Sequence, residues 1–206
     1  MPLIPRTIAV GSMENVKPIL NRSPWCGIPV FRDDFRYMNG LSSPNGWSPD
    51  AATWTTQHCE YEHTDTLAYS FAGDPAWRNY VVKVLVKFIV LYNAGICFRA
   101  TDRNNTYIFD LNGGTETRLY CISGGSVVWG TFTTSFTHVA NRWYELTVEV
   151  RDEGTGVRVK CYVDNQLLHD RLEDPRTFDT GMIGLRSYRY GGGAHAVFDR
   201  VRVWKI

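Results

Sequence analysis

The chain has 206 residues, with 22 Lys and Arg against 21 Asp and Glu, and 44% of its residues are hydrophobic. A chain of this size and composition can form one domain with a sizeable core. Its net charge of +1 provides no general field to attract nucleic acid or an anionic membrane. The longest apolar run, about ten residues with lysines among them, is shorter than the ~20 residues of a membrane helix. We therefore predict no nucleic-acid partner and no membrane span.

Residues 1–29 are predicted to form a proline-rich arm, because prolines stand at positions 2, 5, 18, 24 and 29 without a regular hydrophobic pattern. The arm lacks the uninterrupted apolar segment of a secretory signal. We expect a protein that is extracellular or on the cell surface, with its signal absent from this sequence; a cytoplasmic location is the alternative. The same arm is the segment through which the chain could associate with itself.

Residues 30–206 are predicted to form a single all-β domain. Apolar runs rich in β-branched and aromatic residues recur about every 8 to 12 residues, separated by Gly, Pro, Asn and Asp. No helical period runs through them. The pattern predicts a two-sheet antiparallel β-sandwich or jelly roll. The expected strands cover residues 30–35, 54–63, 66–72, 80–92, 95–100, 107–111, 116–123, 126–136, 143–151, 157–164, 167–172, 182–190 and 196–204.

Three of these runs, within residues 80–111, are expected to lie side by side in one antiparallel sheet. Side chains alternate between the two faces of a strand, so Tyr107, Phe109 and Leu111 are expected to point into the core. Arg99 and Asp110 then face outward from the same sheet.

Several short motifs follow one another along residues 30–206. They are FRDDF (31–35) with Gly46-Trp47 after it, NAGICFR (93–99), Trp143-Tyr144, YVDN (162–165), GMIGL (181–185) and FDRV (198–201). In this order and spacing the chain resembles the concanavalin A-like jelly roll, as found in laminin-G-like domains and carbohydrate-active modules. The resemblance implies a two-sheet antiparallel sandwich, a fold that serves lectins, hydrolases, lyases and structural modules alike.

The resemblance also implies a concave sheet that binds sugar through Arg and Asp hydrogen bonds and aromatic stacking. We predict a lectin-like carbohydrate-binding module whose partner is an oligo- or polysaccharide. An acidic or ketose sugar suits several arginines better than a neutral glucan does. The alternative interpretation is a solvated face of paired charges. The outward candidates are Arg99, Asp110, Arg118, Tyr120, Arg186 and Tyr188, with Trp129 and Tyr190 at the rim.

An enzyme on the same scaffold, a glycoside hydrolase or polysaccharide lyase, is the second hypothesis. Glucanases that resemble this fold carry an E-x-D-x-x-E strand, and the acid-bearing run from Glu145 to Asp152 has neither that spacing nor a central Asp. A lyase would need a His and Tyr pair, without a recognisable motif here, from His58, His138 or His195 with Tyr120 or Tyr188. A structural or assembly protein that uses the arm is the third hypothesis.

A structural Ca²⁺ is a further implication of the resemblance. Asp33 or Asp34 in the first strand of the domain and Asp199 in the last would be neighbours if the terminal strands pair, and calcium takes oxygen ligands. The alternative is that these carboxylates form turn hydrogen bonds or pair with arginines.

The five cysteines have no zinc-ligand spacing. They are predicted to be buried free thiols, with a Cys26–Cys59 disulfide as the alternative.

Overall fold

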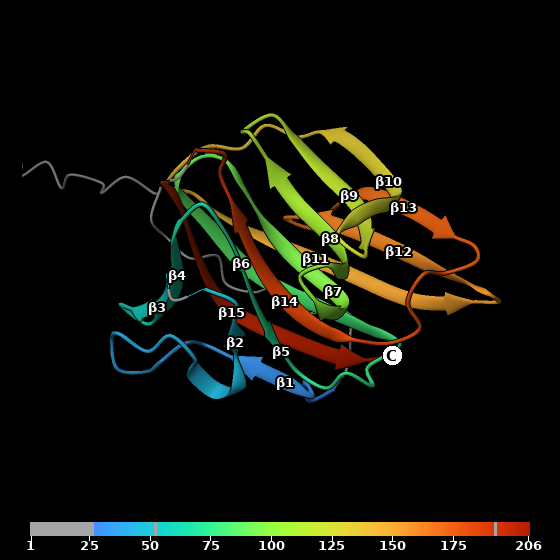
Figure 1. The fold of residues 1–206 in the computed structure, drawn as a ribbon, viewed down its shortest axis with the longest axis horizontal. Coiled ribbons are helices and arrows are strands. Elements are labelled where there is room, and N and C mark those ends of the chain that lie inside the picture. The colour runs from blue at the N-terminus through green and yellow to red at the C-terminus, as the bar shows by residue number, and fades with distance from the viewer. Residues whose placement is uncertain (1–26, 52, 192) are drawn as a thin grey trace, which may run out of the picture.

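The computed structural model describes residues 27–51, 53–191 and 193–206, which form two antiparallel sheets packed face to face (Figure 1). Sheet A runs in the order β13 (Gln166–Glu173), β12 (Gly156–Val163), β11 (Trp143–Glu153), β6 (Tyr80–Val90), β15 (Ala194–Lys205), β4 (Glu60–Asp65) and β3 (Trp54–Gln57), and β1 (Phe31–Asp33) also pairs with β15. Sheet B runs β10 (Ser126–Ser135), β9 (Glu116–Ser123), β8 (Asn105–Asn112), β7 (Asn93–Asp102), β14 (Met182–Tyr188), β5 (Leu67–Ala72) and β2 (Ser48–Pro49). A 3-10 turn (Pro44–Gly46) precedes β2. The predicted all-β, two-sheet antiparallel sandwich is confirmed.

The core lies between the sheets and follows the alternation of side chains along each strand. In β8, Tyr107, Phe109 and Leu111 point into the core, whereas Ile108 packs in a separate cluster on the outer face of sheet B. The same alternation puts Asp110 on that outer face. The assignment of the two faces of this strand from its sequence is therefore confirmed.

The expected pairing of the three runs within residues 80–111 is wrong for the first of them. β6 lies in sheet A, where β11 and β15 occupy its two hydrogen-bonding edges. β7 lies in sheet B between β8 and β14. The chain crosses from one sheet to the other at Leu91 and Tyr92, because a strand with both edges paired has no edge left for its neighbour in sequence.

The alternation in β7 breaks at Arg99. Regular pairing with β8 ends at Phe98 and resumes at Asp102, and Arg99 has a φ of 46°. Such a bulge adds a residue to one strand and re-aims the side chains after it. Ala100 consequently joins the outer-face cluster, and Arg99 does not face outward as predicted.

β1 pairs with β15 in the register Asp33↔Val201, so the first and last strands of the domain are neighbours, as expected. The predicted arm lies outside the described residues up to residue 26, and self-association through it stays a prediction. In the part of the chain that the structure describes, no helix has the length and apolar character needed to cross a membrane.

Candidate functional site

A single row of side chains crosses the outer face of sheet B. Five strands place residues opposite one another in direct register, in the order Tyr69 (β5), Arg186 (β14), Gly95 (β7), Asp110 (β8) and Arg118 (β9). Neighbouring strands lie about 4.8 Å apart, so Arg186 and Asp110 are separated by about 10 Å across the glycine strand. Because Gly95 has no side chain, the long Arg186 side chain can pass over β7 to reach Asp110.

The absence of a side chain at Gly95 is a steric requirement of this row. A Cβ there would lie 2.6 Å from the Cα and 2.8 Å from the Cβ of Asp110. Either contact is shorter than van der Waals separation allows. The sheet therefore holds Asp110 in this place only with glycine opposite it.

Asp110 is fully buried and accepts hydrogen bonds from two guanidinium groups. Arg186 Nη1 lies 2.9 Å from Oδ2, while Arg118 donates from Nε to Oδ1 at 3.2 Å and from Nη2 to Oδ2 at 3.3 Å. Arg118 is bidentate, a geometry that fixes the plane of its guanidinium. The carboxylate thus orients both arginines.

Three tyrosines surround these arginines. The Tyr69 hydroxyl accepts from Arg186 Nε at 3.1 Å, and the Tyr120 hydroxyl donates to Asp110 Oδ2 at 3.4 Å. The Arg186 guanidinium lies 5.2 Å from the ring centroid of Tyr188. Burial raises the pKa of both Tyr69 and Tyr120, so both are neutral phenols. Since Arg186 donates to it, the Tyr69 hydroxyl can direct its own proton to a ligand.

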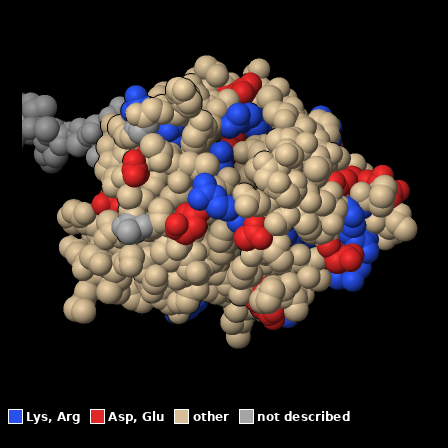
Figure 2. Space-filling model, in the orientation of Figure 1, with Lys and Arg blue, Asp and Glu red and all other residues tan. Residues whose placement is uncertain are grey.

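The β7–β8 turn extends the row. Arg103 Nη1 pairs with Asp50 Oδ2 at 3.0 Å, and its guanidinium lies 5.4 Å from the centroid of the Tyr69 ring. Asp50 also accepts the Tyr69 backbone N–H at 2.7 Å. Figure 2 shows acidic and basic side chains gathered near the middle of the face toward the viewer, which is the outer face of sheet B in Figure 1. We call this set the polar row: Asp50, Arg103, Tyr69, Arg186, Asp110 and Arg118, with Tyr120 and Tyr188 beside it.

The structure brings together five of the six residues predicted as the sugar site. Asp110, Arg118, Tyr120, Arg186 and Tyr188 lie on β8, β9 and β14, on one face of sheet B.

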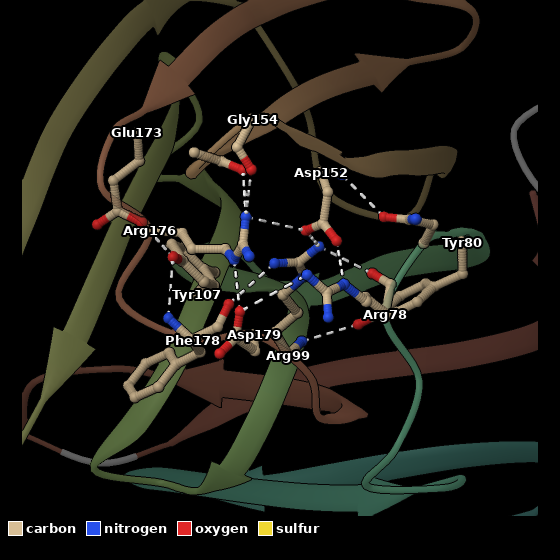
Figure 3. Close-up of polar contacts among 12 residues, drawn as sticks. Arg78, Tyr80, Arg99, Tyr107, Asp152, Gly154, Glu173, Arg176, Phe178 and Asp179 are labelled. Atoms are coloured by element: carbon tan, nitrogen blue, oxygen red, sulfur yellow. Dashed lines mark hydrogen bonds and ion pairs between the residues drawn. The ribbon is translucent and has the colours of Figure 1, made fainter.

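Arg99 is the exception. Its side chain is completely buried at one end of the sandwich, where it donates to Phe178 O at 2.9 Å, Arg78 O at 3.0 Å and Asp152 Oδ1 at 2.7 Å. Figure 3 shows Arg99 among Arg78, Arg176 and Asp152. Burial raises the pKa of Asp152, but hydrogen bonds from Arg78 and Arg99 outweigh it and hold the pKa below its usual value. Arg99 therefore ties β7 to β11 and to the β13–β14 connection.

Sequence reasoning missed Tyr69, Arg103 and Asp50. The alternation Leu67, Tyr69, Phe71 was visible, but these larger side chains face outward, while Ala68 and Ala72 face the core. Arg103 could not be found by strand parity because it stands in a turn. Of the two predicted rim residues, Tyr190 is exposed, whereas Trp129 points inward and packs edge-on against Tyr107.

The carboxylates predicted to hold calcium have protein partners in this structure. Asp34 is paired with Arg202, and Asp33 accepts the Trp47 indole N–H at 3.0 Å. Asp199 accepts the next backbone N–H at 2.8 Å. Among the described residues, no group of three or more His, Cys, Asp or Glu could hold a metal ion. Calcium stays a prediction from the sequence.

The histidines considered for a lyase form no hydrogen bond with Tyr120 or Tyr188. His195 bonds Glu62 in sheet A at 3.0 Å, and His138 accepts the Gly114 N–H at 3.1 Å. His58 stands in the exposed β3–β4 turn. The structure thus joins none of the six His and Tyr pairs considered for that chemistry by a hydrogen bond.

The cysteines follow the expectation of free thiols at four positions. Cys97, Cys121 and Cys161 are free and buried, as predicted, whereas Cys59 is free but exposed. Cys26 lies outside the described residues.

Comparison with known proteins finds solved structures with a similar fold. No family model and no curated protein sequence matches the chain. The structure is similar to a carbohydrate-binding module, CBM66 from Bacillus subtilis, with a TM-score of 0.64 and 20% identity over 80% of this chain and 98% of that one. It is also similar to a glycosyl hydrolase family 16 protein from Mycobacterium smegmatis, with a TM-score of 0.61 and 16% identity over 85% of this chain and 100% of that one.

A third similar structure is LamA from Zobellia galactanivorans, solved with laminaritriose and laminaritetraose. Its TM-score is 0.62, with 12% identity over 86% of this chain and 99% of that one. At these identities the likeness defines the fold alone. The chain has the concanavalin A-like jelly-roll fold that its sequence motifs resembled.

Proposed function

We propose that this protein is a non-catalytic carbohydrate-binding module that holds a sugar on the outer face of sheet B, at the polar row. The observation that carries the proposal is the registered row itself, in which one buried carboxylate orients two arginines between tyrosines. The structural neighbours, among them a carbohydrate-binding module and a protein solved with glucan oligosaccharides, support a sugar ligand on this scaffold.

The chemistry of the row suits a polyol. Arginine N–H groups and tyrosine hydroxyls hydrogen-bond to sugar hydroxyls, while an aromatic ring packs on the apolar C–H face of a pyranose or furanose. Arg118 is partly exposed, with 23% of its side chain accessible, and Tyr188 is half-buried. These two residues would touch the sugar, and the fully buried Asp110 would position Arg118 and Arg186 rather than contact the ligand.

A purely structural role explains the row less well. Charges buried in ion pairs contribute little net stability, because desolvation offsets their attraction, and apolar side chains of similar volume often do as well or better. An apolar cluster that includes Phe71, Cys97 and Ile108 already covers the adjacent part of the same face. A face that could have continued as an apolar cluster instead carries oriented donors, which is typical of a binding site.

A glycosidase is less well supported by the geometry. Retaining and inverting hydrolases use two carboxyl groups across the scissile bond, separated by about 5 to 9.5 Å, one of which must deliver a proton. Both oxygens of Asp110 are occupied as acceptors from arginines. The acid-bearing strand β11 lies in the other sheet.

A glycan array followed by isothermal titration calorimetry tests the proposal. Arg118→Ala and Tyr188→Ala should each weaken sugar binding about tenfold or more, because each removes a charge-assisted hydrogen bond or a stacking ring worth about 1.5 kcal/mol. Arg158→Ala is the matched control, because Arg158 is also bidentate to a carboxylate, Glu153, but lies on β12 in sheet A.

The enzyme alternative is checked on the same samples. Release of reducing ends from the bound polysaccharide over several hours would show catalysis and contradict a purely binding module. Absence of any glycan binding, or equal binding by Arg118→Ala, would contradict the proposed site.

A further inference from the structure

We infer that the sugar bound at the polar row is acidic and that Arg118 binds its carboxylate or sulfate group. This inference rests on the proposed function and names the chemical class of the ligand. The charge balance of the row and the geometry of Arg118 carry it.

The row holds one guanidinium more than its carboxylates neutralise. Arg103 is matched by Asp50 at 3.0 Å. Asp110 must serve both Arg186, at 2.9 Å, and Arg118, at 3.2 Å. Three arginines therefore face two carboxylates, and the unmatched positive charge belongs to the Asp110 group. An oxyanion supplied by a ligand would complete the alternation of charge.

Arg118 is the member best placed to receive that oxyanion. Its side chain is 23% exposed, compared with 8% for Arg186. It uses Nε and Nη2 to hold Asp110, which leaves the Nη1 edge of the planar guanidinium for a second acceptor. A guanidinium can bind two oxyanions on different edges, and its fork geometry matches carboxylate and sulfate oxygens alike.

Neighbouring groups do not occupy the Nη1 edge of Arg118. Asn93 stands on β7, opposite Tyr188 of β14. Its amide oxygen can accept a hydrogen bond from Arg118 Nη2 at 2.7 Å, but an amide carries no charge. Glu116 stands two residues before Arg118 on the same face of β9, but its carboxylate accepts from the amide of Asn112. Glu116 therefore weakens the positive field without occupying Arg118, and its removal should strengthen binding of an anion.

The test is a glycan array on which each acidic glycan stands beside an uncharged counterpart. Polygalacturonate is paired with its methyl ester, and dextran sulfate with dextran, so the two pairs separate carboxylate from sulfate recognition. Calorimetry on the best pair then uses wild type, Arg118→Gln, Glu116→Gln and the control Arg158→Gln. Thermal unfolding of each variant establishes that it is folded.

We expect the acidic member of a pair to bind at least about tenfold more tightly than its neutral counterpart, since a charge-assisted hydrogen bond contributes about 1.5 to 3 kcal/mol. Arg118→Gln should abolish that difference, Glu116→Gln should enlarge it about threefold, and Arg158→Gln should leave it unchanged. Affinity for the acidic glycan should also fall as salt rises.

Three outcomes would overturn the inference, in two different ways. Equal binding of neutral and acidic partners, or acid selectivity that survives Arg118→Gln, would refute an acidic ligand while leaving the carbohydrate-binding module intact. Binding of no glycan on the array would refute the proposed function and this inference with it.

Discussion

Substitution of Arg99 separates a structural arginine from the ligand-binding arginines. Sequence alternation placed Arg99 with Arg118 and Arg186, whereas the structure buries it at the end of the sandwich with three hydrogen bonds. Arg99→Ala should therefore lower stability and leave glycan affinity in the folded protein unchanged. Arg118→Ala should lower glycan affinity and leave stability nearly unchanged.

The magnitude follows from the contacts that are lost. Removal of the guanidinium leaves the part-buried carbonyls of Phe178 and Arg78 without the Arg99 donor, and an unsatisfied buried acceptor costs about 1 to 3 kcal/mol, with part-buried ones near the lower value. Asp152 loses one donor but retains Arg78 and Arg176. A loss of about 3 kcal/mol results, near the lower limit for breaking a buried ion pair. For a chain of this length it corresponds to a fall in Tm of about 6 to 12 °C.

Differential scanning calorimetry measures the change in Tm, and titration with the array-selected glycan below that Tm measures affinity. Arg118→Ala serves as the matched variant, with an expected change of Tm below about 3 °C because Arg118 is partly exposed. Loss of glycan binding by Arg99→Ala at an unchanged Tm would refute the assignment of Arg99 as a structural residue.

Three further outcomes are expected. Gly95→Ala should lower the free energy of unfolding by about 2 to 3 kcal/mol in chemical denaturation, because the new Cβ overpacks against β8. It should also weaken glycan binding. Wild-type stability of this variant would show that the space between Gly95 and Asp110 can accept a Cβ. With Cys26 replaced by Ser, Ellman's reagent at pH 8 should label only Cys59 rapidly. Burial raises the pKa of the other three thiols, Cys97, Cys121 and Cys161. Labelling of all four thiols before unfolding would contradict this. Burial lowers the pKa of His63 and His169 to about 4, so the unfolded state binds more protons between pH 6.5 and 4 and the Tm should fall across that window; a flat profile would contradict it.

Local patterns in the sequence determined the strands and most of their faces. Alternation with period two and turn residues such as Gly124-Gly125 act over a few residues, so they place β9 and β10 where the structure has them. The same alternation correctly put Asp110, Arg118 and Arg186 on an outer face. These properties depend on each strand alone and therefore survive without knowledge of its neighbours.

Only the tertiary structure decided which strands are neighbours and in what register. β6 and β7 are consecutive yet lie in different sheets, because each already has partners on both edges. The bulge at Arg99 reverses the alternation after it and removes this residue from the predicted site. Gly95, which the sequence marks only as the first residue of a predicted strand, leaves the space over which the Arg186 side chain reaches Asp110. Register is a property of pairs of strands that are distant in sequence, so no single strand contains the information that aligns the polar row.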